Sequence, residues 1–199
     1  MILNNPELSP EQAIEAIADR VGQLLQTQPR VLLAIDGQSA SGKTTAAEQL
    51  AEWLDARVLH MDDFFLQPSM RTAERLATPG GNVDIERFCR DVLPALLEGA
   101  SVTLERYDCH LDELLPPVVI PPRAVTIVEG AYSLHPLLKP HYDLSVFFKI
   151  DPVLQRSRIL ARNGEEMLQM FLSRWIPMEN RYFEAFSVEQ TCDFVVSVR

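Results

Sequence analysis

The architecture of this chain follows from one segment, Val31-Leu-Leu-Ala-Ile-Asp-Gly-Gln-Ser-Ala-Ser-Gly-Lys-Thr-Thr45. Its five leading apolar residues, 31–35, predict a strand that is buried on both faces. Residues 37–44 then match the phosphate-binding pattern G-x-x-x-x-G-K-S/T without a gap. Apolar residues recur at helical spacing through residues 44–55, which predicts a helix directly after the motif. The motif therefore lies between a strand and a helix N-terminus, which is the context that phosphate binding requires.

The motif brings together the groups that bind a nucleotide such as ATP, unless it is only a glycine-rich turn that binds nothing. Gly37 and Gly42 allow a tight turn whose backbone N–H groups point inward at an anion. The helix N-terminus adds unpaired N–H groups and the positive end of its dipole. Lys43 supplies a charge for the outer phosphates, and the Thr44 hydroxyl is a ligand for Mg²⁺. The residues expected to bind the nucleotide are Gly37, Gln38, Ser39, Ala40, Ser41, Gly42, Lys43, Thr44 and Thr45.

The length of 199 residues indicates one domain, and a hydrophobic content of 47% is ordinary for a globular protein. We expect an N-terminal helical extension over residues 1–29, in which Ser9 caps a helix that ends before Pro29, and a core over residues 30–199. The first apolar cluster, residues 1–3, is too short for a secretory signal. No apolar run approaches the roughly 18 residues that span a bilayer. Three cysteines at wide, irregular spacing argue for a reducing compartment, so the sequence predicts a cytoplasmic protein.

The formal net charge of −10 bears on the partners of this chain. Such a charge argues against nonspecific binding to nucleic acid or to anionic membranes. It leaves room for a local basic pocket that binds a phosphorylated ligand. The expected partner is therefore a small-molecule substrate, and the sequence leaves open whether the chain forms a homo-oligomer.

Two further strands are expected to end in carboxylates. Apolar residues 58–61 run into Asp62 and Asp63, and apolar residues 124–128 run into Glu129. Because ligands in open α/β sheets bind at the carboxyl ends of the strands, Asp62 is placed to face the γ-phosphate. Glu129 is the candidate that helps Thr44 to hold magnesium. The alternative for each is an ordinary solvated strand end, and for Asp63 we favour a role in capping the next turn.

The middle of the chain carries the candidates for contact with the acceptor. Residues 66–83 are rich in proline and glycine and predict a mobile loop over the site. Asp84 is expected to cap a helix to Leu97, which kinks or restarts at Pro94.

A short strand at residues 102–104 precedes Tyr107, Asp108 and His110, which could contact a polar substrate or be ordinary loop residues. The proline-rich segment 114–122 is expected to be extended.

The C-terminal part of the chain predicts a buried strand at residues 144–150 and then a helix that carries Arg158 and Arg162. These two arginines share a face, so on a mobile segment they could clamp the transferring phosphate and exclude water. The alternative is a solvated helix face. Gly164 breaks the segment, and residues 165–185 predict a further helix. The Met and aromatic residues expected to form its buried face are Met167, Met170, Phe171, Trp175, Met178, Tyr182 and Phe186.

Strands that alternate with helices predict a doubly wound, mostly parallel α/β sheet, which a last strand at residues 194–198 completes. The order of the motifs across roughly residues 30 to 198 resembles the uridine kinase and phosphoribulokinase family, to which nicotinamide riboside and pantothenate kinases are similar. The motifs that carry the resemblance are Gly37–Thr44, Met-Asp62-Asp-Phe-Phe, Arg-Tyr107-Asp108, Val-Glu129-Gly130 and the arginines after Asp151-Pro152. The resemblance implies a P-loop NTPase fold, with a mostly parallel sheet flanked by helices as in nucleoside and nucleotide kinases.

The resemblance also implies roles for individual residues. It makes Asp62 the general base that takes the proton from a sugar hydroxyl, and it places Glu129 in the magnesium shell. It places Asp84 and Tyr107 near a nucleoside, and we expect His110 to line the same pocket. Uridine kinases usually have a Phe after Tyr-Asp, whereas this chain has Cys109 and His110 there.

The sequence therefore predicts a kinase that uses ATP and Mg²⁺ to phosphorylate a hydroxyl of a small molecule, with a nucleoside as the leading acceptor. Lys43, Asp62, Arg158 and Arg162 are the expected catalytic residues. There are two alternatives. The acceptor could be a molecule such as pantothenate or a sugar, or the protein could be an ATP-binding module that transfers nothing. A GTPase-like switch is disfavoured because the sequence contains no Asn-Lys-x-Asp motif for guanine.

Overall fold

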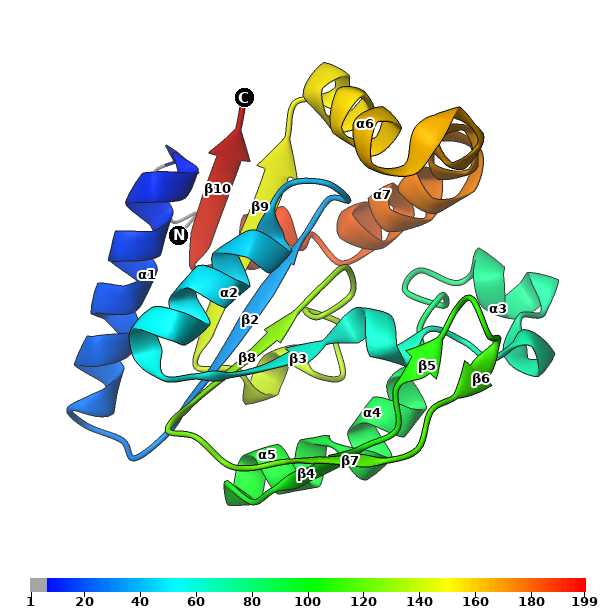
Figure 1. The fold of residues 1–199 in the computed structure, drawn as a ribbon. Helices are drawn as coiled ribbons and strands as arrows, with labels where there is room; N and C mark the ends of the chain where they lie inside the picture. Colours follow the sequence, from blue (N-terminus) through cyan, green and yellow to red (C-terminus); the bar gives the residue numbers. More distant parts are fainter. Residues whose placement is uncertain (1–6) are drawn as a thin grey trace.

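A computed structural model describes residues 7–199 of the chain (Figure 1). The apolar cluster at residues 1–3 lies outside this range. Within it, no helix combines the length and the apolar character needed to cross a membrane.

A six-stranded sheet in the order β1-β10-β9-β2-β8-β3 forms the centre of the fold. Every pair of neighbouring strands is parallel, which confirms the predicted sheet. The strands are β1 (Glu7–Leu8), β2 (Val31–Gly37), β3 (Arg57–His60), β8 (Val125–Glu129), β9 (Leu144–Ile150) and β10 (Phe194–Val198). The two-residue edge strand β1 was not predicted, because two residues carry no periodicity. All of β2 is buried, as its run of apolar residues indicated.

Helices cover both faces of this sheet. Side chains of α1 (Pro10–Leu25) and α2 (Lys43–Leu54) pack on one face with Val31, Leu33 and Ile35 of β2. Leu32 and Ala34 point to the opposite face, where they join a second apolar cluster. Because successive side chains of a strand alternate between the two faces, β2 serves both clusters. The predicted cap of α1 is confirmed, since Ser9 and Gln12 exchange side-chain and backbone hydrogen bonds.

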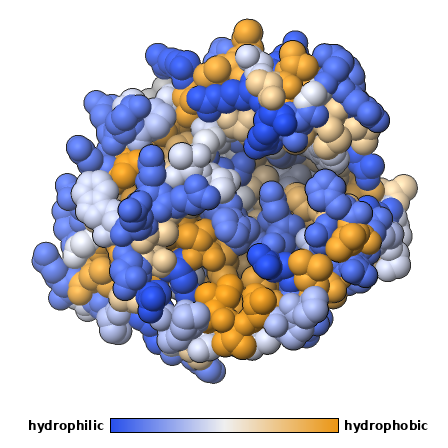
Figure 2. Space-filling view, viewed as in Figure 1, coloured by the Kyte–Doolittle hydropathy of each residue, from blue (hydrophilic) through white to orange (hydrophobic). Residues whose placement is uncertain are grey.

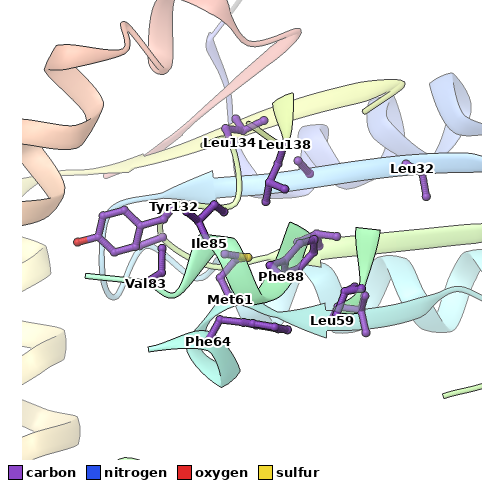
Figure 3. Close-up of a cluster of buried hydrophobic side chains, with 14 of the residues drawn as sticks. Leu32, Leu59, Met61, Phe64, Val83, Ile85, Phe88, Tyr132, Leu134 and Leu138 are labelled. Carbon is purple, nitrogen blue, oxygen red and sulfur yellow. The ribbon is translucent and has the colours of Figure 1, made fainter. Parts of the chain in front are cut away.

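The second cluster joins the sheet to the helices that follow β3. Figure 3 shows Met61, Phe64 and Phe88 grouped there, and the rings of Phe64 and Phe88 lie 4.9 Å apart. The helix predicted from Asp84 onward divides at Val92 into α4 (Ile85–Asp91) and α5 (Leu93–Glu98). The proline expected to mark this restart lies in the first turn of α5, where its missing N–H has no helical partner to lose.

Short elements fill the rest of the segment between β3 and β8. They are η1 (Met61–Phe64), η2 (Pro68–Met70), α3 (Ala73–Ala77), β4 (Val102–Leu104), β5 (Tyr107–Asp108), β6 (Glu113–Leu114) and β7 (Val118–Ile120). β4 pairs with β7, and β5 pairs with β6, in two antiparallel ribbons. The extended course predicted for residues 114–122 is therefore confirmed.

The C-terminal helices arch over the carboxyl ends of the central strands (Figure 1). They are α6 (Pro152–Met170), a π-helical turn (Phe171–Trp175) and α7 (Ile176–Ala185), and short 3₁₀ turns lie at Lys139–His141 and Glu189–Thr191. The predicted break in α6 is confirmed at Gly164, which has a φ of 79°.

The prediction that the Met and aromatic face of residues 165–185 is core was wrong in part. Tyr182 is fully buried, but Met167 and Met170 are 36% and 37% exposed. The second half of α6 passes above the end of the sheet and does not lie along its face, and of its residues after Gly164 only Leu168 is buried.

Candidate active site

The phosphate-binding motif forms a tight loop between β2 and α2. Gly37 and Gly42 have φ values of 146° and 92°, which side chains with a Cβ rarely adopt. A Cβ on Gly37 would lie 2.2 Å from the carbonyl oxygen of Phe148, so the loop approaches β9 closely. The N–H of Gln38 donates to that same carbonyl at 3.0 Å. These contacts fix the curvature of the loop without any ligand.

Several polar groups of the loop fit a bound phosphate. Residues at the start of α2, from Lys43 onward, have N–H groups without an acceptor one turn earlier. The hydroxyl of Ser41 is buried and has no hydrogen-bond partner in the described part of the chain. The ammonium of Lys43 lies over the loop and donates to the Gln38 carbonyl at 3.3 Å. An anion in the loop would satisfy all of these donors.

The two predicted magnesium ligands contact each other. The Thr44 hydroxyl donates to Oε2 of Glu129 at 3.2 Å, and Glu129 is 4% exposed. Mg²⁺ in such sites is held by one or two protein oxygens together with substrate phosphates, and it keeps several waters. Residues 7–199 contain no group of three or more His, Cys, Asp or Glu that could hold a metal by themselves. The oxygen pair of Thr44 and Glu129 therefore suits Mg²⁺ that arrives with a nucleotide.

His60 completes this pair, and sequence reasoning missed it. Its Nδ1 lies 2.5 Å from Oε1 of Glu129. The hydrogen bond to Glu129 raises the pKa of His60, against the opposing effect of burial. The contact arises because His60 of β3 is the register partner of Glu129 in β8, which a local motif cannot reveal.

Asp62 lies at the start of the 3₁₀ turn that follows β3. Its side chain is accessible to solvent but lies in a recess, and desolvation by the surrounding protein raises its pKa. The charges of Lys43 and Arg162 act in the opposite direction and favour the carboxylate. Three of the predicted catalytic residues therefore interact electrostatically.

The arginines of α6 border the same recess. The guanidinium of Arg158 donates to the carbonyl of Ala40 in the phosphate loop at 3.1 Å. Arg162 is exposed and its Nε donates to the side chain of Asn163 at 2.8 Å. Figure 2 shows the recess as a hollow below α6 on the face viewed in Figure 1. Neither arginine has a buried partner among these contacts, and Arg158 touches the phosphate loop itself.

Two of the residues predicted to contact the acceptor, Asp84 and Tyr107, are buried and have partners within the chain. Asp84 is buried, caps α4 by accepting the Arg87 N–H at 3.0 Å, and lies 3.6 Å from the Arg87 guanidinium. The buried Tyr107 hydroxyl contacts Arg71 at 2.5 Å and also Asp112.

The turn after Tyr107 approaches the recess through its cysteine. Asp108 accepts the backbone N–H groups of His110 and Leu111 at 2.7 and 3.1 Å, which closes a local turn, and His110 is exposed. Cys109 lies near Asp62, whose charge adds to the effect of burial in raising the thiol pKa. Of the residues in this turn, Cys109 is therefore the one whose thiol is affected by the charge of the predicted base.

Two buried carboxylates that sequence reasoning missed hold the phosphate loop. Asp36 accepts hydrogen bonds from the N–H groups of Gly37, Tyr132 and Leu134 and from the Tyr182 hydroxyl. Burial raises the pKa of Asp36 to about 6. An aspartate inside an otherwise apolar strand was the signal that could have identified it. Glu179 of α7 contacts the loop itself, and the position of that helix could not be read from the sequence.

A cavity of about 770 Å³ adjoins the loop at the carboxyl ends of β9 and β10. The polar residues that line it include Gln38, Lys149, Asp151, Asn180, Glu184 and Arg199. Its volume lies in the range of small-molecule pockets, about 300–1,000 Å³. Gln38 of the phosphate loop is one of its lining residues.

Several known structures have a similar fold, and three of them are kinases or candidate kinases. A candidate uridine kinase from Bacillus stearothermophilus has a TM-score of 0.66 and 25% identity, and the match covers 91% of this chain and 99% of that one. A candidate fructose transport system kinase from Silicibacter sp. TM1040 has a TM-score of 0.65, 22% identity and coverage of 90% and 98%. YFH7 from Saccharomyces cerevisiae, a candidate P-loop kinase with a circular permutation, has a TM-score of 0.64, 14% identity and coverage of 94% and 98%.

Sequence comparison is less informative. No protein-family model matches the chain. Inorganic pyrophosphatase TTM2 from Arabidopsis thaliana is 25% identical over 164 residues, a match that covers 77% of this chain but only 24% of that protein. The similarity is therefore carried mainly by the fold. The chain therefore has the fold of the P-loop kinases, and the similar structures support its resemblance to the uridine kinase-like members of that group.

Proposed function

We propose that this protein transfers the γ-phosphoryl group of ATP to a hydroxyl of a small molecule, with a nucleoside as the leading acceptor. The observation that carries the proposal is the meeting of three groups in one recess. They are the phosphate loop with Lys43, the Thr44 and Glu129 oxygen pair, and the Asp62 carboxylate. A non-catalytic ATP-binding module would have no use for a base beside the outer phosphates.

The chain's own residues perform the positioning on which phosphoryl transfer depends. The loop N–H groups and Lys43 bind the outer phosphates, and Arg158 and Arg162 neutralise charge on the transferring group. Thr44 and Glu129 would hold Mg²⁺, which offsets the negative charge of the phosphates when it is bound. Asp62 accepts the proton of the acceptor hydroxyl, a task that suits a carboxyl whose pKa is raised.

The two partners of the reaction have separate places in this proposal. The cavity beside β9 and β10 takes the nucleoside part of ATP, because Gln38 of the phosphate loop lines it. The acceptor enters from the side of the Tyr107–His110 turn, where Cys109 lies near Asp62. Pantothenate or a sugar is the alternative acceptor, since a cysteine leaves more room than the phenylalanine of uridine kinases.

The proposal is tested by measuring ATP consumption with uridine, cytidine, nicotinamide riboside, pantothenate and simple sugars. Wild-type protein should turn over at least one of them, and a ribonucleoside should be best. Lys43→Ala should remove most of that turnover with the fold retained, because Lys43 has only a weak contact to the loop in the absence of phosphate. Unchanged turnover in a correctly folded Lys43→Ala variant would refute the phosphate-binding role of the loop.

A further inference from the structure

Glu179 places a buried carboxylate directly on the phosphate loop. Its Oε2 accepts the backbone N–H of Ser39 at 3.0 Å, and its Oε1 accepts the Ser39 hydroxyl. The residue is 5% exposed and lies in the first turn of α7. One of the loop amides that a phosphate is expected to use is therefore occupied by an anion of the chain itself.

The charges around Glu179 make this contact unfavourable once a nucleotide is present. Burial raises the pKa of Glu179, Lys43 and the Ser39 hydrogen bonds lower it, and the charge of Asp36 raises it again. The carboxylate and the outer phosphates thus depend on the same cation, Lys43, and on the same loop. Two anions a few ångströms apart in a partly desolvated site repel each other strongly.

We propose that Glu179 stands in for the terminal phosphate of the nucleotide and is displaced from Ser39 when a triphosphate binds. The inference rests on the nucleotide site proposed above. It makes Glu179 a determinant of nucleotide affinity, because every binding event has to release this contact first.

The release of Glu179 would act first on the segment that carries it. α7 continues the second half of α6 through the π-helical turn, and this second half is separated from Arg158 and Arg162 by the break at Gly164. One turn further along α7, the Tyr182 hydroxyl donates to Asp36 at 2.8 Å and anchors the helix to β2. We therefore expect α7 to stay anchored at Tyr182, while its first turn, which carries Glu179, moves when a nucleotide binds the loop.

Equilibrium binding of ATP, ADP and AMP to wild type, Glu179→Gln and Glu48→Gln tests the proposal. Glu179→Gln keeps an oxygen for Ser39 but removes the charge, so it should bind ATP about tenfold or more tightly, with a smaller gain for ADP and none for AMP. Glu48 is exposed on α2, and its variant should match wild type for all three.

The other outcomes of the binding experiment distinguish failure of this inference from failure of the proposed function. If wild type binds ATP and Glu179→Gln binds it equally or more weakly, the carboxylate braces the loop, and the inference falls while the proposed function stands. If neither protein binds ATP, the proposed nucleotide site fails and the inference falls with it.

A second measurement follows the position of α7 by tryptophan fluorescence. Trp53 is 60% exposed on α2, and Trp175, the other of the two tryptophans, ends the π-helical turn just before α7. In a Trp53→Phe background, ATP should change the emission of Trp175, and Glu179→Gln should show part of that change before ATP is added. Emission that ATP leaves unchanged would overturn the displacement of α7.

Discussion

Replacing Asp36 with alanine should destabilise the fold by several kcal/mol. Four donors converge on this buried carboxylate, three backbone N–H groups and the Tyr182 hydroxyl, at 2.7 to 3.1 Å. Leaving four buried donors unpaired costs about 4–12 kcal/mol, at about 1–3 kcal/mol each. Removing a carboxylate whose pKa is raised from 3.8 to about 6 returns about 3 kcal/mol at neutral pH. The cost of the unpaired donors exceeds this return, so we expect Asp36→Ala to lower the free energy of unfolding by about 5 kcal/mol.

The destabilisation caused by Asp36→Ala should depend on pH in a defined direction. Because the pKa of Asp36 is raised in the folded protein, its contribution to stability is largest below pH 3.8 and falls as the pH rises to about 6. The difference in unfolding free energy between wild type and Asp36→Ala should therefore be larger near pH 4 than at pH 7.

Urea unfolding followed by circular dichroism measures this difference at both pH values. Asp19→Ala, at an exposed position of α1, serves as the control and should change stability little. An Asp36→Ala variant as stable as wild type at pH 7, or a difference that grows from pH 4 to pH 7, would refute the reasoning.

Two further predictions concern the recess. His60→Ala should raise the Mg²⁺ concentration needed for half-maximal turnover by about 10- to 100-fold, because Glu129 loses the partner that orients it. An unchanged Mg²⁺ titration would contradict this prediction, and magnesium-dependent thermal stabilisation gives a readout besides turnover. Arg158→Ala and Arg162→Ala should each lower turnover while the melting temperature stays that of wild type, since neither loses a buried partner; wild-type turnover in both would identify a merely solvated helix face.

The local parts of the fold could be predicted because their signals are local. The run from Val31 into the phosphate motif contains a strand, a loop and a helix start within fifteen residues, and each was found where it was expected. The carboxylates at Asp62 and Glu129 could be predicted for the same reason, because each directly follows or ends a short apolar run. Parallel strands then bring their carboxyl ends to one edge.

The parts that could not be predicted depend on how distant segments meet. His60 reaches Glu129 only through the register of β3 with β8. Glu179 reaches Ser39, 140 residues earlier, only because α7 returns across the loop. The exposure of Met167 and Met170 has the same origin, since periodicity identifies an apolar face of a helix but not whether another element covers it.

The central claim is phosphoryl transfer with Asp62 as the base, and the kcat of Asp62→Asn tests it most directly. The substitution keeps size and hydrogen bonding but cannot accept a proton. Steady-state kinetics with the best acceptor should show a kcat lowered by roughly 10²-fold or more, with ATP affinity unchanged. Asp63→Asn, one residue away, is the matched control and should retain most of the wild-type kcat. Wild-type kcat in Asp62→Asn, or a larger loss in Asp63→Asn, would contradict the account.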